Sequence, residues 1–592
     1  MKEHLQELLV TALKRTLAET GANLAPTIQL DATRDAKFGD FQTNLALQLA
    51  KPLGKPPRAV AEMLLRHLPE STRVAKVEIA GPGFINFFLA QAALQSVVSE
   101  VLAQGDAYGC DRSGSKGRIM VEFVSANPTG PMHVGHGRGA AYGDSMARLL
   151  AATGWTVWRE YYINDAGRQV DVLATSVWTR YLQACGETIE VARRGYPGDY
   201  IQRTAAALRE RHGETFRRPA AEVLAGLPPD PAVPDGASEA QKDEIKAQQE
   251  RYLDALIARA KTLLGDGYAE IRSAALADQL ATIRKTLADF NVHFDQWTSE
   301  QALVDSGFVA KALARLTERG LTYEKDGALW MRTADFGDEK DRVLVKADGA
   351  ATYFCNDLAY HIDKLERNWP VLMDVWGADH HGYIARVRAA IEALTGRKDA
   401  LNVQLVQFVT LSSGRMGKRS GNFVTLQDLI IDAGADATRF FFLMRSHDQH
   451  LEFDIDLARS QSNDNPVYYV QYAHARICSV FQQLADKNGQ WDADTAKLTL
   501  HRLTNEHEKA LLTLLARYPE MLERAAAAYT PHTVVFFLKD LAEALHSYYN
   551  THRFLVEDDP ELQAARLALI RATGQVIRNG LAILGVSAPE KM

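Results

Sequence analysis

The sequence has few cysteines and no long apolar run. Its four cysteines, Cys110, Cys185, Cys355 and Cys478, are scattered over 592 residues, without the paired spacing of a zinc knuckle or a redox couple. We therefore expect reduced thiols and no disulfide framework. No apolar stretch approaches the roughly 20 residues that a membrane-spanning helix needs, so we expect no membrane insertion.

The sequence also lacks a basic character. The formal net charge is −7 at pH 7, which argues against a protein that coats nucleic acid without selection, although a local basic surface can coexist with an acidic total. Residues 1–15 carry acidic side chains where a secretory signal would be basic and then apolar, so we expect a cytoplasmic protein. With 46% hydrophobic and 24% charged residues, the composition is that of a globular protein.

The chain is longer than one hydrophobic core usually serves, so we expect three or more domains. Residues 1–110 indicate a small α/β domain, because leucines at helical spacing lead up to Gly21 and two β-rich runs flank a Gly-Pro-Gly turn at residues 81–83. Residues 105–117 are rich in glycine, serine and charge, which is typical of a linker.

Residues 111–463 indicate an α/β domain with a Rossmann-like parallel sheet. A buried strand at 118–125, a helix to about residue 152 and a strand at 156–163 give a βαβ order, after which Asn164 or Asp165 can cap the next helix. Ligands of such sheets gather at the carboxyl ends of the strands.

The α/β pattern is interrupted at about 187–300 by charged sequence of helical period, which we interpret as a helical insertion. Strand-like runs at 341–354, 370–383 and 401–411 then predict that the sheet is completed near residue 412. Residues 464–592 have helical periodicity and few strand signals, which predicts an all-α domain.

The stretch SANPTGPMHVGHGRG, residues 125–139, holds His133 and His136 among glycines and prolines at the end of the first strand of this domain. At a helix N-terminus the two imidazoles can donate to phosphate oxygens, and Gly135 leaves space for adenine against the backbone. A metal site and a purely structural turn are the alternatives. No carboxylate or third ligand stands at the usual helical spacing for a metal.

The stretch SSGRMGKRSGN, residues 412–422, places Arg415, Lys418 and Arg419 among serines and glycines after the last strand. It does not match the GxxxxGK[ST] pattern of a P-loop. A mobile basic loop fits this composition, and a solvated surface loop is the alternative.

Together, HVGH after the first strand and the basic loop after the last resemble the HIGH and KMSKS elements of class I aminoacyl-tRNA synthetases. The segments YYINDAGRQ, GADHHGY, NPVYYVQYAHAR and GVSAPEKM narrow the resemblance to the arginyl-tRNA synthetases, over essentially the whole chain. FGDFQTNLALQLAK and GPGFINFFL resemble that family's N-terminal additional domain, which implies that residues 1–110 contact the tRNA elbow. Residues 464–592 resemble its anticodon-binding bundle.

The resemblance implies that ATP activates L-arginine to arginyl adenylate, and that the arginyl group then moves to the 3′ end of tRNA(Arg). In that family's pattern His133, Gly135 and His136 match ATP-binding residues, and Arg415, Met416 and Lys418 match the loop that stabilises pyrophosphate. Mg²⁺ is expected with ATP and without a dedicated protein site. The loop departs from KMSKS at Arg415, Gly417 and Arg419, which leaves open whether tRNA is needed for adenylate formation.

Recognition of arginine requires carboxylates that accept paired hydrogen bonds from a guanidinium group. The resemblance gives this role to Glu122 and Asp357, with Tyr353 as a neighbouring contact. It places Asn127 and His380 at the α-amino or carboxylate end of the substrate. Because such polar recognition rejects other amino acids, and the insertion lacks a strand-rich editing pattern, we predict no editing.

For tRNA binding the resemblance points first to Tyr472, and then to Met592, in the helical domain. Core packing is the alternative for a helical tyrosine. A monomer is the family expectation. Two other functions remain open from the residues, a synthetase for cysteine or glutamate and an RNA-binding paralogue without catalysis. The absence of a cysteine cluster argues against the first, and the presence of His133, His136 and Lys418 argues against the second.

Overall fold

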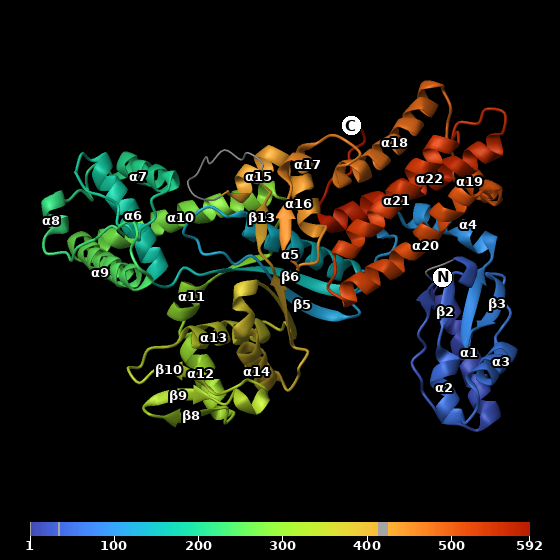
Figure 1. The fold of residues 1–592 in the computed structure, drawn as a ribbon, viewed down its shortest axis with the longest axis horizontal. Helices are drawn as coiled ribbons and strands as arrows, with labels where there is room; N and C mark the ends of the chain where they lie inside the picture. The colour runs from blue at the N-terminus through green and yellow to red at the C-terminus, as the bar shows by residue number, and fades with distance from the viewer. Residues whose placement is uncertain (1, 34–35, 413–423) are drawn as a thin grey trace. The chain divides into compact units, whose positions relative to one another are not determined.

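The computed structural model describes residues 2–33, 36–412 and 424–592 (Figure 1). By their internal contacts these residues form two compact units, Met1–Asp111 with Gln461–Met592, and Arg112–Ser460. The division between the units at residue 111 lies within the glycine- and serine-rich stretch 105–117. None of the helices in the described ranges combines the length and the apolar character that crossing a membrane requires.

The first part of the first unit is an antiparallel sheet covered by helices. Its strands β1 (Asp31–Ala32), β2 (Phe41–Thr43), β3 (Val74–Ala80) and β4 (Phe84–Leu89) lie in the order β1-β2-β4-β3. Helices α1 (Lys2–Thr20), α2 (Leu45–Leu53) and α3 (Pro57–His67) share a core with it. The helix predicted to end at Gly21 and the predicted hairpin are both confirmed, since Gly21 has φ 65° and β3 pairs with β4.

The second part of this unit is helical. It contains α18 (Pro466–Asp486), α19 (Ala493–Thr499), α20 (Glu506–Ala527), α21 (His532–Thr551) and α22 (Pro560–Leu584). Helix α4 (Gln91–Gln104) packs against α20 and α22, and the Gln95 side chain donates to the Leu503 carbonyl at 2.9 Å. The Tyr108 hydroxyl donates to the Leu515 carbonyl at 2.9 Å. Helix α4 and Tyr108, which follow the N-terminal sheet, therefore pack as part of the helical bundle.

The second unit is built on a five-stranded parallel sheet in the order β12-β11-β5-β6-β7, which confirms the predicted fold class. Its strands are β5 (Gly117–Glu122), β6 (Trp155–Ile163), β7 (Gln296–Ser299), β11 (Val371–Gly377) and β12 (Leu401–Val406). The chain adds β6 and β7 on one side of β5, and later adds β11 and β12 on the other. The strand order therefore reverses between β5 and β11, which is where ligands of such sheets bind.

Helices and a small second sheet surround the parallel strands. Helix α5 (Val134–Ala152) packs on β5 and β6 (Figure 1). A second group consists of α11 (Glu300–Asp305), α12 (Phe308–Glu318), α13 (Tyr353–Glu366) and α14 (Ile384–Thr395). A third group consists of α15 (Leu426–Ala433), α16 (Ala435–Leu443) and α17 (Ile455–Arg459).

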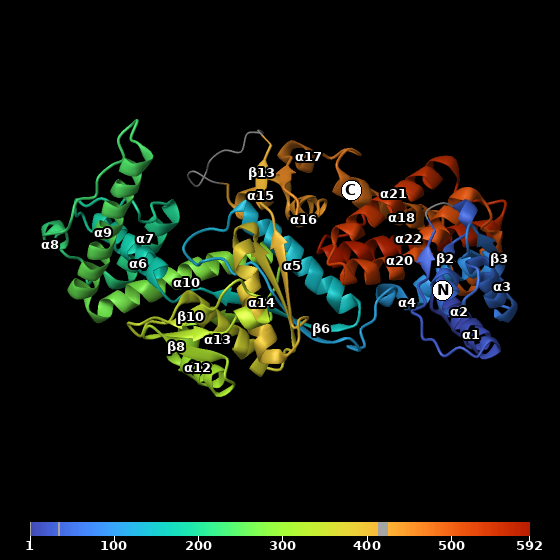
Figure 2. The same cartoon turned by 60° about the horizontal axis from the view of Figure 1, so that its bottom comes forward.

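The insertion after β6 is helical, as predicted, and has a core of its own. Helices α6 (Arg168–Ala184), α7 (Asp199–His212), α8 (Ala220–Leu224) and α9 (Glu239–Leu264) gather away from the parallel strands. Helix α10 (Asp266–Asp289) runs from this group toward the sheet (Figure 2). The insertion ends before residue 300, because β7 is already part of the parallel sheet.

Two strands that the sequence assigned to the parallel sheet belong elsewhere. β10 (Arg342–Val345) forms an antiparallel sheet with β8 (Thr322–Lys325) and β9 (Ala328–Met331). β13 (Val409–Leu411) pairs with β14 (Leu451–Phe453), so the parallel sheet ends at Val406 and not near residue 412. The prediction was wrong here because an apolar run indicates a strand but does not indicate which strand it pairs with.

The predicted cap of the helix after β6 is also wrong. Helix α6 begins after Gly167, which has φ 107° and makes no side-chain cap. The Asp165 carboxylate instead accepts hydrogen bonds from the Ser299 hydroxyl at 2.7 Å and the Gln301 backbone N–H at 2.9 Å. Asp165 thus lies just before α6 in the sequence, but its carboxylate binds residues at the start of α11, which lies much later in the chain.

Candidate functional site

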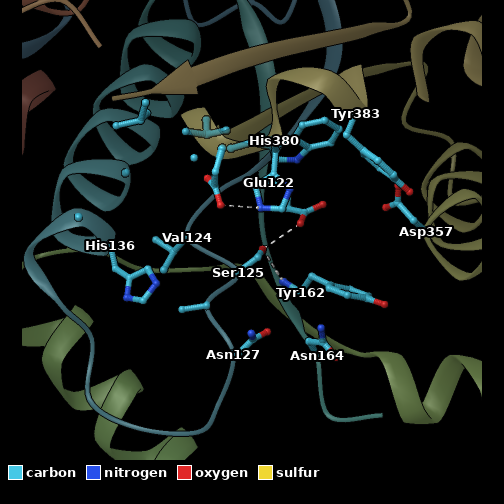
Figure 3. Close-up of a pocket in the computed structure, with 18 of the residues that line it drawn as sticks. Glu122, Val124, Ser125, Asn127, His136, Tyr162, Asn164, Asp357, His380 and Tyr383 are labelled. Atoms are coloured by element: carbon cyan, nitrogen blue, oxygen red, sulfur yellow. Dashed lines mark hydrogen bonds and ion pairs between the residues drawn. The ribbon is translucent and has the colours of Figure 1, made fainter. Parts of the chain in front are cut away.

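A cavity of about 570 Å³ opens at the carboxyl ends of β5 and β11, where the strand order reverses (Figure 3). It brings together all the predicted site residues of this unit that the structure describes: Glu122, Asn127, His133, Gly135, His136, Tyr353, Asp357 and His380. Arg415, Met416 and Lys418 lie outside the described residues. Tyr472 and Met592 belong to the other unit.

The turn that leaves β5 has a strained backbone. Val124 has φ 68° and Ser125 has φ 40°, values that non-glycine residues rarely adopt, least of all a β-branched valine. The Ser125 hydroxyl donates to Glu122 at 2.9 Å and accepts the Tyr162 backbone N–H at 3.1 Å (Figure 3). These bonds tie the turn to the ends of two neighbouring strands and hold it in its unfavourable conformation.

The two histidines of HVGH form the start of α5. The backbone N–H of His136 donates to Nδ1 of His133, and the backbone N–H of His133 donates to Nδ1 of His136, each at 3.3 Å. The rings stack with their centroids 3.6 Å apart. A Cβ atom at Gly135 would lie 3.0 Å from the His133 ring, so a larger residue there would press on that ring.

This mutual cap fixes the chemistry of both rings. Because each Nδ1 accepts a hydrogen bond from a backbone N–H, each ring must carry its own proton on Nε2. Burial lowers the pKa of His133, and burial together with His133 lowers the pKa of His136 to about 3, so both rings are neutral near pH 7. The start of α5 therefore offers two uncharged N–H donors beside free backbone N–H groups.

After the segment 413–423 the chain is attached to this helix start, whereas the residues directly before the segment pair with β14. After the segment, Thr425 pairs with His133 in an isolated bridge, and the Leu426 N–H donates to the Met132 carbonyl at 2.7 Å. Before it, the buried Arg138 donates to the Gln407 carbonyl at 3.0 Å. Arg138 also donates to the carbonyls of Ser446 and Gln449. The sequence analysis overlooked Arg138, which only the fold brings beside these carbonyls.

The other end of the cavity is acidic. Glu122 is 8% exposed, and its carboxylate accepts from the Lys364 ammonium at 2.5 Å as well as from Ser125. Burial raises the pKa of Glu122, and the nearby Lys364 charge opposes that rise. Glu122 thus meets the cavity as a carboxylate that is already held on both oxygens.

Asp357 is the acid with unused capacity. Its Oδ1 lies 3.4 Å from Nδ1 of His361, while its Oδ2 is buried and accepts no hydrogen bond of normal geometry from any described residue. The Tyr383 hydroxyl is also buried and makes no hydrogen bond of normal geometry with a described residue. The side chains of Tyr383 and Asp357 lie side by side in Figure 3. Burial and the Asp357 charge raise the pKa of Tyr383. A carboxylate oxygen has two lone pairs, so Asp357 Oδ2 beside the Tyr383 hydroxyl can accept a further hydrogen bond from a ligand.

Tyr353 lies one helical turn before Asp357 on α13, as predicted, and 60% of its surface is exposed. Burial of its hydroxyl, with the charges of Asp357 and Glu122, raises the pKa of Tyr353, so it stays a neutral donor. At the rim, Asn127 is exposed, and the His380 ring lies 3.7 Å from Asp379. These side chains flank the acids without neutralising them.

The sequence analysis overlooked a third acid, Glu300, at the start of α11. It is 5% exposed, and the Asn356 amide donates to it at 3.4 Å. Burial raises its pKa, and the charges of Asp165 and Asp357 act in the same direction. No motif marks Glu300, since it follows a four-residue strand at the end of the insertion. Glu300 is recognised only in the structure, from its electrostatic interaction with Asp357.

In the other unit, Tyr472 lies on α18 and is partly buried. Its ring stacks on Tyr468 at 5.9 Å and on His546 at 5.8 Å, and the Arg476 guanidinium lies 4.6 Å from its centroid. Met592 is 50% exposed at the end of a tail that follows α22, and the carbonyl of Pro589 in that tail accepts from His474 of α18. Tyr472 and the tail therefore adjoin the same helix.

Cys185 and Cys355 are buried thiols. Within the described ranges, no three or more His, Cys, Asp or Glu side chains gather closely enough to hold a metal ion.

Comparison with known families divides the chain into three matches. Residues 3–89 match the arginyl tRNA synthetase N terminal domain. Residues 97–191 and 239–453 match the catalytic domain of tRNA synthetases class I (R). Residues 470–592 match the DALR anticodon binding domain. The gap in the catalytic match, 192–238, falls within the helical insertion.

Individual proteins match over the full length. The arginine–tRNA ligase of Thioalkalivibrio sulfidiphilus is 51% identical over 600 residues, covering 100% of both chains. That of Legionella pneumophila (strain Paris) is 47% identical over 599 residues. Among solved structures, a putative arginyl-tRNA synthetase from Campylobacter jejuni is 29% identical with a TM-score of 0.71, covering 85% of this chain and 100% of that one.

The fold has a further solved counterpart over the whole chain. The arginyl-tRNA synthetase of Thermus thermophilus has a TM-score of 0.74 and covers 100% of both chains at 24% identity. Full-length identity near one half to curated relatives, three family matches in the same order and a shared fold agree with one another. The chain belongs to the arginyl-tRNA synthetase family of class I aminoacyl-tRNA synthetases.

Proposed function

We propose that this chain attaches L-arginine to tRNA(Arg) in two steps. The arginine carboxylate attacks the α-phosphorus of ATP, which forms arginyl adenylate and releases pyrophosphate. A terminal ribose hydroxyl of the tRNA then attacks the activated carbonyl carbon, and AMP leaves. Family membership over the full length supports this reaction, as does a cavity with neutral donors at one end and buried acids at the other.

The ATP phosphates would lie at the start of α5. The Nε2–H groups of His133 and His136 and the backbone N–H groups there can donate to phosphate oxygens, and Gly135 leaves room for the nucleotide. In this proposal Arg415, Met416 and Lys418 act on the leaving pyrophosphate. The attachment of Thr425 and Leu426, just after their segment, to the start of α5 supports it.

ATP enters as its Mg²⁺ complex in this proposal, so the metal belongs to the substrate. Aspartates and glutamates bind Mg²⁺ through one or two carboxylates plus phosphate oxygens, which needs no all-protein cage. Proximity of the carboxylate to the α-phosphate and stabilisation of the developing charge then account for most of the rate.

The arginine side chain would lie among the acids, and the observation that carries this assignment is the Asp357 carboxylate, which lines the cavity with a buried Oδ2 beside the neutral Tyr383 hydroxyl. A guanidinium group brings planar, paired N–H donors to such a carboxylate. Glu122, whose charge Lys364 balances, lines the same cavity. Glu300 interacts electrostatically with Asp357, and the Tyr353 hydroxyl offers a neutral contact. Lysine lacks the planar fork, and a neutral side chain would bring no positive charge to Asp357.

The α-amino and carboxylate groups of arginine would then point toward the histidines. Asn127 and His380 line the cavity between the two ends and are the proposed contacts for these groups. With the guanidinium at Asp357 and the triphosphate at α5, the reacting carboxylate is held near the α-phosphate. We propose no editing site, because this polar pocket discriminates at the binding step.

The tRNA would contact the first unit. We propose that residues 1–110 bind the tRNA elbow and that residues 464–592 bind the anticodon, with Tyr472 and, less centrally, Met592 as contacts. The family matches at 3–89 and 470–592 support these roles, and the partly exposed Tyr472 ring beside Arg476 is suited to stacking on an unpaired base. A monomeric, cytoplasmic enzyme completes the proposal.

The test is ATP–pyrophosphate exchange with each of the twenty amino acids, with and without tRNA(Arg). We expect exchange with arginine alone. Citrulline is the matched control, because it has the shape of arginine without the charge, and it should support no exchange. Exchange with cysteine or glutamate would contradict the proposal. No exchange under any condition would favour an RNA-binding protein without catalysis.

A further inference from the structure

Three acids stand in a row across the parallel sheet. In the strand register Glu122 of β5 lies beside Glu160 of β6 on one side and beside Asp374 of β11 on the other. All three are buried, with exposures of 8%, 0% and 1%. Three buried carboxylates on adjacent strands would repel one another strongly unless cations neutralise them.

A matching row of bases covers them. His361, Lys364 and Arg367 follow at intervals of three along α13 and its C-terminal cap, which places them on one face. Lys364 donates to Glu122 at 2.5 Å and to Asp374 at 3.1 Å. Arg367 donates to both oxygens of Glu160, at 2.7 and 2.8 Å.

The third base, His361, is charged by its geometry. Its Nδ1 faces the Asp357 carbonyl and its Nε2 faces the Asp374 carboxylate, each at 2.8 Å. Both neighbours are acceptors, so both nitrogens must carry protons. Burial lowers the pKa of His361, but Asp357 and Asp374 outweigh that effect and raise it to about 10. Three cations therefore balance the three acids of the row.

Lys364 has a special place in this arrangement because it alone joins two acids of the row. It is 0% exposed, and of the three acids only Glu122 lines the cavity. A continuous chain of contacts runs from Asp357 through His361, Asp374 and Lys364 to Glu122. Two cavity acids that come from different elements are thereby linked through the buried row.

We propose that Lys364 is a positioning residue for arginine binding, which holds Glu122 in place and balances its charge without touching the substrate. With the row neutralised, the excess negative charge at this end of the cavity rests on Asp357 and Glu300. A cationic side chain is then attracted to those two acids and not to the row. The inference rests on the proposed function, since it concerns how the same site selects arginine.

The experiment compares Lys364→Met with Arg367→Met in aminoacylation assays with arginine, ATP and tRNA(Arg). Lys364→Met should raise the arginine KM by about 10- to 100-fold, the effect of losing a charge-assisted hydrogen bond, with the ATP KM changed less than about twofold. Arg367→Met is the matched control. It breaks a similar ion pair in the same row, but its partner Glu160 does not line the cavity, so Tm should fall while the arginine KM stays within about twofold.

The double variant Glu122→Gln with Lys364→Met separates positioning from stability. It removes both charges of the pair, so part of the lost Tm should return while the arginine KM remains high. This variant is also the readout if Lys364→Met alone does not fold. Equal rises in arginine and ATP KM, equal effects of Lys364→Met and Arg367→Met, or a normal arginine KM in the double variant would overturn the inference. A wild-type chain without arginine-dependent activity would instead overturn the proposed function.

Discussion

The two ends of the cavity handle charge in opposite ways. At the start of α5, His133 and His136 are neutral rings that cap one another, and the donors there are N–H groups without formal charge. At the other end, charges are numerous, and burial is made tolerable by pairing acids on three strands with bases on one helix.

In the proposed function, this difference follows from what each end binds. A triphosphate carries its own counter-ion, so fixed neutral donors can orient it without competing for the metal. An arginine side chain arrives with a single positive charge, and a protein distinguishes it by leaving negative charge unpaired where the guanidinium will lie. In the proposed function Asp357 provides that charge, because the hydroxyl beside it, that of Tyr383, is neutral.

The largest effect is expected at the acid end. Asp357→Asn keeps the shape of the side chain and removes the charge, and it should lower kcat/KM for arginine by about 10²- to 10³-fold, mainly through KM. Steady-state aminoacylation at varied arginine checks this. Asp363→Asn on the same helix is the control, since Asp363 pairs with Arg367 and does not line the cavity. An unchanged arginine KM in Asp357→Asn would remove the basis of the comparison.

The second effect concerns the histidine end. His136→Asn keeps an acceptor for the His133 backbone N–H but removes the Nε2–H donor, so the rate of adenylate formation should fall by about 10²-fold or more. The arginine KM should stay within about twofold, because the acids are untouched. Single-turnover formation of adenylate measures the rate. A loss that appears mainly as a higher arginine KM would show that the two ends are not separate.

A smaller effect is expected outside the cavity, where a substitution should weaken tRNA binding and leave both ends of the cavity unchanged. Tyr472→Ala should raise the tRNA KM by about tenfold, the effect of losing one stacked base, while the KM values for arginine and ATP stay unchanged. Tyr469→Ala on the same helix, where the ring packs against His546 at 4.4 Å, is the control for damage to the bundle. Equal losses for all three substrates would count against a tRNA contact at Tyr472.

The smallest effect sharpens the comparison through pH. The pKa of His136 is lowered to about 3 in the folded chain. Between about pH 6.5 and pH 3 the unfolded chain therefore binds a proton at His136 and the folded chain does not, so stability falls as the pH drops from about 6.5 toward 3. The pKa of His361 is raised to about 10, so its contribution to stability is complete below about 6.5 and is lost as the pH rises toward 10.

Thermal unfolding across pH measures both effects. His136→Asn should flatten the acid side of the Tm profile and His361→Asn the alkaline side, each by about 2 °C. If both variants changed the same side, the assignment of one neutral and one charged histidine would be wrong.

Several features could be predicted from local sequence. The leucines of α1, the Gly-Pro-Gly hairpin and the HVGH turn are each encoded within a few neighbouring residues, and the structure has them where the pattern indicated. Of the eight cavity residues, three were predicted from the turn after a strand of the parallel sheet, namely His133, Gly135 and His136. The other five were predicted only from the resemblance to arginyl-tRNA synthetases, namely Glu122, Asn127, Tyr353, Asp357 and His380. The roles of these residues, and of Arg415, Met416 and Lys418, remain predictions.

Other features could not be predicted in this way. The partner of a strand depends on packing, so β10 and β13 were placed in the wrong sheet. Asp165 was assigned to the helix next in sequence, whereas its carboxylate serves α11. Glu300 follows a strand of four residues at the end of a helical insertion, too short for its alternation to be recognised.

By itself, the sequence determined the helices and strands with strong local periodicity, and the turn whose glycines and histidines cap a helix. Only the tertiary structure decided which charges face one another. Glu122, Glu160 and Asp374 become neighbours through strand register, and His361, Lys364 and Arg367 reach them because α13 crosses that row. Local propensity acts over a few residues, whereas the pairing of buried charges depends on contacts between segments up to 242 residues apart.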